Sequence, residues 1–500
     1  MPVLFPMAAS PNLFELTAAL LRLLAVFAVL ADGLLQVLFR LADVTATCVI
    51  AVRAGKPECY AARMATVRMV RIARRKLTLI PLVAATYFMV SGGPYGLEDL
   101  VQSAGYGRAV LVLLITPVLW ALPTALMVGE LASAVPEEGG YYEWVRRAMG
   151  PFWGFQEAWL SLAASVFDMA LYPTLFVLYL GRIWPRMGDG HVALAVGVAV
   201  IAMCVAWNLA SARSVGNGSV LVGVLLLAPF VVLVVEAILK PRVAAPPMIG
   251  AHLPLMMGVL VVMWNYMGWD NASTVAGEVE NPQRNYPLAV FLAVAAVAAT
   301  YLIVVGAAWR IGIAPAAWNT GAWVEVATSV GGRALGLAVV AGGMLCGLGM
   351  MNALVLSYSR VPMAMAKDGL LPRLLSRTST HTGAPWVSIL VCAAVWSLSL
   401  GLGFERLIEL DVMLAGLSIV LEFAALIVLR VREPGLPRPF RVPGGLAGAV
   451  LIAFLPSLLL GVAIARNVSE QGLTRGLLLG LGLVVAGPAL YFVMRTAKAP

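Results

Sequence analysis

Long apolar runs, separated by short polar and basic segments, occupy most of the chain after residue 76. A run of about 18 apolar residues or more is long enough for a helix that crosses the hydrocarbon core of a bilayer. Twelve such runs are present, so we expect an all-α integral membrane protein with twelve transmembrane helices. The expected helices cover residues 77–104, 108–134, 151–184, 191–208, 214–239, 254–279, 286–309, 333–360, 385–402, 406–430, 446–466 and 473–494.

Two of these runs, the first and the sixth, are interrupted near their middle. The first break is SGGPYG at residues 91–96, and the second is NYMGWD at residues 265–270. Backbone leaves the helix at membrane depth only where it is buried in protein or lines a wet cavity. Glycines can also serve close helix packing, but packing does not require the polar and acidic residues present here. The paired breaks therefore predict a central binding site in a solute transporter.

Composition agrees with a membrane location. Hydrophobic residues make up 61% of the chain and charged residues 12%, about half of the ~25% that is usual in soluble domains. The net charge of +9 comes from basic residues between the apolar runs, so we expect the lipid bilayer, and no nucleic acid, as the partner.

The distribution of Lys and Arg predicts the orientation. With residue 76 in the cytoplasm, the cytoplasmic segments carry roughly twice as many basic residues as the opposite side. We therefore expect a multi-pass protein of the cell (inner) membrane, with both ends of the twelve-helix core in the cytoplasm. Residues 1–69 are expected to form a non-core extension; residues 1–63 could be an amphipathic surface helix, a thirteenth span or an upstream translation artefact.

Motifs for metal binding and catalysis are missing from the sequence. The five cysteines show no CxxC spacing and the three histidines are scattered, which disfavours a metal site. The sequence contains no P-loop, HExxH, GxSxG or GxGxxG motif. We expect neither an enzyme nor a protein that needs a cofactor.

The two breaks offer different chemistry. Glycines in the first break expose backbone amides, and a second half-helix begins near Leu97 with its positive end at the break, which suits a carboxylate. In the second break Asp270 lies beside Asn265, Tyr266 and Trp269, which suits an ammonium group.

Charged residues inside the predicted helices are a further signal. Asp168 lies near the centre of the third run, where an unpaired charge costs at least ~2.5 kcal/mol, so it should face the interior of the bundle. Together Asp168 and Asp270 could meet two separated positive charges. Glu422 could be a buried structural partner or take part in proton transfer. The other carboxylates lie toward helix ends and are expected to be interfacial or paired with loop arginines: Glu98, Asp99, Glu130, Glu157, Glu278 and Glu280.

Four segments resemble the amino acid, polyamine and organocation permeases, in that family's order and spacing. They are SGGPYG, the loop GELASAVPEEGGYYEWVRRAMGPFWGF at 129–155, WNYMGWDNASTVAGEVENPQRNYP at 264–287 and SRVPMAMAKDGLLP at 359–372. The resemblance covers residues 70–495. Within the family, the Glu98-Asp99 pair and the DMALYP stretch of the third run are most similar to the polyamine uptake branch known from plants and protozoa.

The resemblance implies a LeuT-like 5+5 inverted repeat with helices 1 and 6 broken. Residues 70–250 and 251–432 would form the two repeats, and residues 433–500 would hold helices 11 and 12. Substrate would bind between helices 1, 3, 6, 8 and 10, with Trp264 as the gating aromatic and with Tyr358 and Asn352 as wall residues. The expected substrate-binding residues are Ser91, Gly92, Gly93, Pro94, Tyr95, Gly96, Asp168, Trp264, Asn265, Tyr266, Gly268 and Asp270.

The sequence leaves the coupling ion open. Several proton-coupled relatives carry a lysine within the fifth helix, but here no lysine precedes Lys240 at its far end. A proton held by Asp168, Asp270 or Glu422 is expected to drive transport, and sodium bound by break carbonyls and Ser357 is the rival.

We predict proton-coupled uptake of an amine-bearing metabolite by alternating access, with polyamines ahead of amino acids. The alternatives are a permease or exchanger for neutral or cationic amino acids and a solute sensor that does not transport.

Overall fold

The described part of the chain is helical. The computed structural model describes residues 79–137, 139–210, 212–241, 255–271, 273, 282–379, 382–472 and 474–496, and these residues contain no β-strand. Nine of the described helices are long and apolar enough to cross a membrane. The N-terminal extension expected over residues 1–69 lies outside the described residues and stays a prediction.

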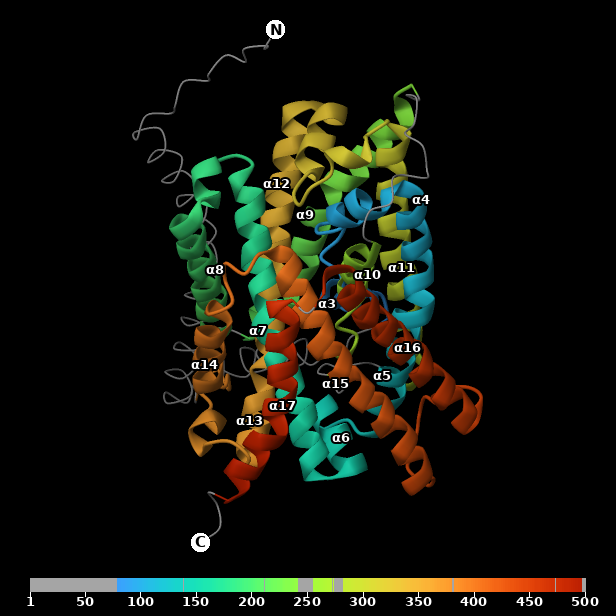
Figure 1. The fold of residues 1–500 in the computed structure, drawn as a ribbon, viewed down its shortest axis with the longest axis vertical. Helices are drawn as coiled ribbons and strands as arrows, with labels where there is room; N and C mark the ends of the chain where they lie inside the picture. Colours follow the sequence, from blue (N-terminus) through green and yellow to red (C-terminus); the bar gives the residue numbers. More distant parts are fainter. Residues whose placement is uncertain are drawn as a thin grey trace, which may run out of the picture. The chain divides into compact units, whose positions relative to one another are not determined.

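Most of the long helices run along the length of one bundle (Figure 1). The α-helices are α3 (Leu79–Val90), α4 (Glu98–Thr116), α5 (Leu122–Ala134), α6 (Tyr141–Met149), α7 (Pro151–Gly181), α8 (Gly190–Ala210), α9 (Ala212–Leu239), α10 (Leu255–Asn265), α11 (Pro282–Arg310), α12 (Trp323–Tyr358), α13 (Arg360–Lys367), α14 (Trp386–Ser397), α15 (Phe404–Arg432), α16 (Gly445–Gln471) and α17 (Arg475–Thr496). A π-helix, η1 (Pro117–Ala121), joins α4 to α5, and three short 3-10 helices are η2 (Pro185–Gly188), η4 (Pro315–Ala317) and η5 (Arg373–Ser376).

Two helices stop in the middle of the bundle. The structure describes 12 residues of α3 and 11 residues of α10, which cover about 18 Å and 16 Å. Each ends where the sequence is interrupted, α3 at Val90 and α10 at Asn265. After the first break the chain continues as α4, which bends at Gly105 because that glycine has φ +67°. The bend separates the first and second predicted spans.

One helix begins earlier than the hydropathy pattern indicates. The eighth span is predicted from residue 333, but α12 begins at Trp323 and bends at Gly332, where φ is +73°. The segment before the bend contains Glu325 and Thr328, so its apolar content is too low for a span. It is an additional helical segment at that end of α12.

At the opposite end of the bundle lie the short helices α6 and α13 (Figure 1). A buried ion pair near this end joins α5 to α15. Glu130 accepts hydrogen bonds from Arg430 through both oxygens and from the backbone N–H of Val442 at 2.7 Å, and Arg438 lies 3.2 Å away. Glu130 is thus paired with arginines as predicted, and its lone pairs are well satisfied, as a buried charge requires.

The core surrounds α7. This helix packs against α15, α12, α6 and α8, while α10 packs against α4 and α15. Small residues bring the backbones together: a Cβ added at Gly347 of α12 would lie 2.5 Å from the carbonyl oxygen of Tyr172 in α7. α3 packs against α12, α10 packs against α15, and Trp264 of α10 reaches Asp168 of α7, so the two broken helices end beside α7, α12 and α15.

Candidate substrate site

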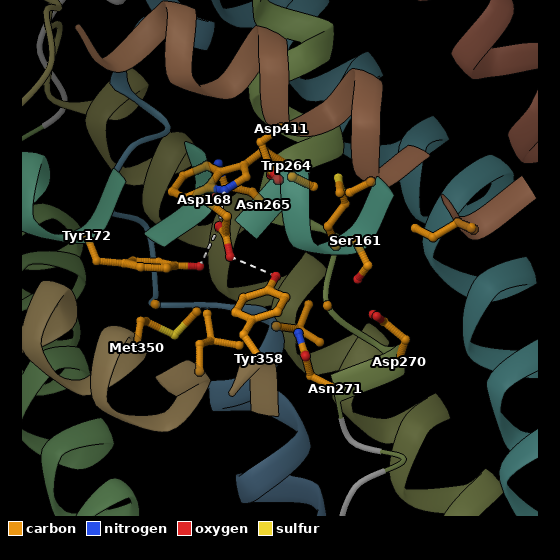
Figure 2. A pocket seen from close by; sticks show the side chains of 18 of the residues that line it. Ser161, Asp168, Tyr172, Trp264, Asn265, Asp270, Asn271, Met350, Tyr358 and Asp411 are labelled. Carbon is orange, nitrogen blue, oxygen red and sulfur yellow. Dashed lines mark hydrogen bonds between the residues drawn. The ribbon is translucent and has the colours of Figure 1, made fainter. Parts of the chain in front are cut away.

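A cavity lies where the two breaks meet α7, α12 and α15 (Figure 2). Its volume of about 50 Å³ is several times the ~10–15 Å³ that a single water requires. Acidic, hydroxyl, amide and aromatic side chains are well represented in its lining: Asp168, Asp270, Asp411, Ser161, Ser418, Asn265, Asn271, Tyr95, Tyr172, Tyr358 and Trp264. We call this space the central cavity.

Asp168 is oriented by three hydrogen bonds from three helices. Tyr172 donates to Oδ1 at 2.9 Å, Tyr358 donates to Oδ2 at 3.0 Å, and Trp264 Nε1 donates to Oδ1 at 3.3 Å. Figure 2 shows the two tyrosine hydroxyls pointing at this carboxylate. All three donors are neutral, so they fix the position of the carboxylate without neutralising its charge.

A second carboxylate of the cavity, Asp411, was not predicted from the sequence. It comes from α15, is 2% exposed and lies beside Asp168 (Figure 2). The sequence does not show that Asp411 is buried, because its charged neighbours Glu405, Arg406 and Glu409 make this part of α15 resemble a helix end. A usable signal was the spacing of eleven residues to Glu422, since three helical turns place both carboxylates on the same face.

The third carboxylate, Asp270, lies at the other side of the cavity, near Ser161 (Figure 2). It remains within electrostatic range of Asp168 and Asp411. No Lys or Arg occurs among the described residues that line the cavity. The cavity thus has two separated negative regions. Asp168 and Asp411 form one, and Asp270 forms the other.

Most polar groups of the first break are already engaged. The backbone N–H of Gly93 donates to Ser91 Oγ at 3.1 Å, and Ser91 Oγ lies 2.7 Å from the hydroxyl of Tyr301. The carbonyl of Pro94 accepts from Trp323 Nε1 at 2.9 Å. The Gly93 amide, one of the groups suited to a substrate carboxylate, therefore already has a partner.

The positive end of the second half-helix is occupied as well. Glu98, the first residue of α4, is fully buried and accepts from the Tyr179 hydroxyl at 2.5 Å and the Gly321 N–H at 3.0 Å. Asp99 accepts from the Thr320 hydroxyl at 2.9 Å. The expectation that these two acids are interfacial or paired with loop arginines is wrong, because both are buried and neutral donors hold them. Two carboxylates in its first turn satisfy the helix dipole from within the chain.

The structure brings seven of the predicted site residues together at the cavity and leaves five outside its lining. Inside are Gly92, Tyr95, Asp168, Trp264, Asn265, Gly268 and Asp270; outside are Ser91, Gly93, Pro94, Gly96 and Tyr266. The predicted wall residue Tyr358 lines the cavity, whereas Asn352 accepts a hydrogen bond from Asn208 elsewhere.

Two of the predicted coupling residues also lie outside the lining of the cavity. Ser357 donates to Asn271 Oδ1 at 2.8 Å. Glu422 is buried further along α15.

Trp264 lines the cavity and lies between the first break and the start of α15. Its ring meets Phe404 edge to face, with centroids 5.6 Å apart, and a Cβ added at Gly96 would lie 3.1 Å from it. The indole N–H reaches Asp168. The gating role of Trp264 stays a prediction.

An all-helical, multi-span bundle with two interrupted helices around an acidic cavity defines a membrane transporter. The family model described as amino acid permease matches residues 83–481. The chain belongs to this permease family, so the predicted family and the LeuT-like fold class are confirmed, and the chain is not an enzyme.

The chain is also similar to several relatives that are named as transporters or exchangers. Polyamine transporter RMV1 of Arabidopsis thaliana is 34% identical over 442 residues, 87% of this chain and 88% of the relative. Polyamine transporter PUT1 of Oryza sativa subsp. japonica is 35% identical over 421 residues, 84% and 79% of the two chains. More distant is the serine/threonine exchanger SteT of Bacillus subtilis, 26% identical over 396 residues, 76% and 86% of the two chains.

Proposed function

We propose that this protein takes up polyamines such as putrescine and spermidine by secondary active transport. The observation that carries the proposal is the central cavity, which holds Asp168, Asp411 and Asp270 and no basic residue among its described lining. Buried carboxylates without a basic partner favour a cation, and two separated negative regions suit a substrate with at least two ammonium groups. The names of the relatives RMV1 and PUT1 support the same substrate class.

Aromatic side chains strengthen the preference for amines. Tyr172, Tyr358 and Trp264 line the cavity around Asp168, and aromatic faces attract organic ammonium groups by about 0.5–2 kcal/mol each. The methylene groups of a polyamine would pack against the same rings.

A neutral or cationic amino acid is the second candidate. Gly92 lines the cavity at the first break, and its backbone could approach a substrate carboxylate. The engaged Gly93 amide and the acids at the start of α4 argue against this candidate.

We propose a proton as the driving ion, held by Asp168 or Asp270, the two predicted coupling residues that line the central cavity. Lys240 lies just after the end of α9, and its ammonium group donates to the carbonyl of Val330 in α12. This position argues against a coupling mechanism that uses Lys240. Sodium remains the alternative, and replacing the pH gradient by a sodium gradient distinguishes the two.

The test is uptake of radiolabelled putrescine and of an amino acid panel into proteoliposomes, with and without an inside-alkaline pH gradient. We expect gradient-driven putrescine accumulation that spermidine competes and amino acids do not. Asp168→Asn and Asp411→Asn should each reduce uptake at least tenfold, whereas Glu470→Gln, an exposed residue of α16, should not. Accumulation of an amino acid instead, or full activity of both Asn variants, would contradict the proposal.

We further propose that the protein lies in the cell membrane with the α6 and α13 end in the cytoplasm, as the distribution of Lys and Arg indicates. A Cys introduced at the exposed Thr378, near this end, should be protected from a membrane-impermeant maleimide in intact cells. A Cys at the exposed Ala316, at the opposite end of α12, should be labelled. The reverse pattern would invert the orientation.

A further inference from the structure

The interface between α7 and α15 repeats its polar positions in matching register. These helices pack together. They run in opposite directions, because Asp168 interacts with Asp411 while the earlier Glu157 bonds to the later Ser418. Ser161 precedes Asp168 by seven residues in α7, and Ser418 follows Asp411 by seven residues in α15. All four line the central cavity.

The register continues for one more turn toward the α6 end. Glu157 precedes Ser161 by four residues, and Glu422 follows Ser418 by four residues. We call Glu157 and Glu422 the glutamate pair. It lies eleven residues, or about 16 Å along the helices, from Asp168 and Asp411.

The glutamate pair contacts a residue that lines the central cavity. Ser418, which lines the cavity, donates to Glu157 Oε1 at 2.9 Å. Glu422 and Asp270 both lie within electrostatic range of Glu157. A group that leaves the cavity between Ser161 and Ser418 therefore meets the glutamate pair next.

The pair is buried and incompletely satisfied. Glu157 is 0% exposed and Glu422 is 1% exposed, and among the described residues the Oε2 atom of each has no hydrogen-bond partner. The expectation that Glu157 is interfacial or paired with a loop arginine is therefore wrong. The buried hydroxyl of Tyr141 in α6 lies within electrostatic range of both glutamates. The guanidinium of Arg430, two turns further along α15, is engaged by Glu130. Two buried carboxylates within electrostatic range of each other are stable only when a proton or another cation offsets their charge, so the pair can accept a positively charged group.

We propose that the glutamate pair is a second cation site, which binds an ammonium group of the polyamine between the central cavity and the cytoplasm. This inference rests on the proposed function. A diamine in the cavity occupies the three aspartates, and an amine with a third nitrogen extends past the two serines to the glutamates. The site therefore favours longer polyamines and receives the leading ammonium group during release.

The experiment is equilibrium binding of radiolabelled spermidine and putrescine to the purified full-length protein in nanodiscs. Glu157→Gln and Glu422→Gln should each lower the ratio of spermidine to putrescine affinity about tenfold, the effect of losing a hydrogen bond between charged groups. Glu470→Gln removes the same charge from an exposed position of α16 and is the matched control. Asp168→Asn should weaken both amines together.

The outcomes separate the two proposals. An unchanged affinity ratio in folded Gln variants overturns the second site, and so does an effect confined to the pH-gradient dependence of uptake, which would make the pair a proton site. A wild-type protein that binds neither amine overturns the proposed function instead. If the Gln variants fail to fold, Glu157→Asp and Glu422→Asp keep the charge but shorten the side chain, and they should lower the ratio several-fold; an unchanged ratio contradicts the site.

Discussion

At the scale of single residues, the position of the Asp168 carboxylate depends on hydroxyl groups from two helices. Tyr358→Phe removes a 3.0 Å hydrogen bond and Tyr172→Phe removes a 2.9 Å bond. A hydrogen bond to a charged group contributes about 1.5–3 kcal/mol, so each variant should weaken putrescine binding about tenfold or more.

Tyr106→Phe is the matched control for these variants. Its hydroxyl is also in the interior, where it donates to the carbonyl of Ile313 at 2.9 Å, but Tyr106 does not line the cavity. Putrescine affinity should be unchanged in this variant. Equal losses in all three variants would show that the effect is on folding rather than on the orientation of Asp168.

The sequence could predict some of these residues and not others. Asp168 stands out because it lies alone in a long apolar run, and Asp270 because it interrupts one. Asp411 has charged neighbours in the sequence, and its burial depends on α7 packing across it. The hydrogen bonds of Tyr172 and Tyr358 depend on the approach of α12 to α7, which no local pattern specifies.

At the scale of elements, the close approach of α7 and α12 depends on glycine. A Cβ at Gly347 would lie 2.5 Å from a backbone carbonyl oxygen of Tyr172, and backbone cannot rotate away as a side chain could. Gly347→Ala should therefore lower the free energy of unfolding by about 1–3 kcal/mol, measured by thermal or denaturant unfolding in detergent.

Gly306→Ala in α11 is the control for that substitution, because a Cβ there meets nothing within 4 Å. Its stability should stay close to that of the wild type. The same stability for both variants would show that α7 and α12 can separate slightly without cost, and that the contact at Gly347 is not restrictive.

Some helix boundaries can be predicted from the sequence and others cannot. The helix ends at Val90 and Asn265 follow from local chemistry, because glycine, proline and acidic residues interrupt apolar runs there. The segment Trp323–Gly331 is too polar for hydropathy to detect, and it is placed by long-range contacts: Trp323 reaches Pro94, and Gly321 just before it reaches Glu98.

At the scale of the whole molecule, the ion pair of Glu130 joins parts of the chain 300 residues apart. Glu130→Gln would leave the buried Arg430 without its counter-charge, and breaking a buried pair in this way costs about 3–5 kcal/mol. We expect a clear loss of thermal stability. A variant as stable as the wild type would mean that water or another acid replaces Glu130.

The exposed pair of Arg147 and Glu433 provides the comparison. Its 2.7 Å bond holds the pKa of Glu433 below the usual value of 4.5. A carboxyl group with a lowered pKa stabilises the folded state at pH values above its usual pKa. This contribution to stability is lost as the pH falls through the lowered pKa. Because the pair is exposed, Glu433→Gln should change stability only slightly at neutral pH.

The matched spacing of α7 and α15 also constrains how this protein can change during evolution. Inserting one residue between Glu157 and Asp168 would turn one end of α7 by about 100° relative to the other, so at least one of its acids would lose its partner in α15. Substitutions at these positions alter the chemistry of one site, whereas an insertion or deletion in either helix separates the two sites. Relatives that handle different amines should therefore differ in the residues at these positions and keep the number of residues between them.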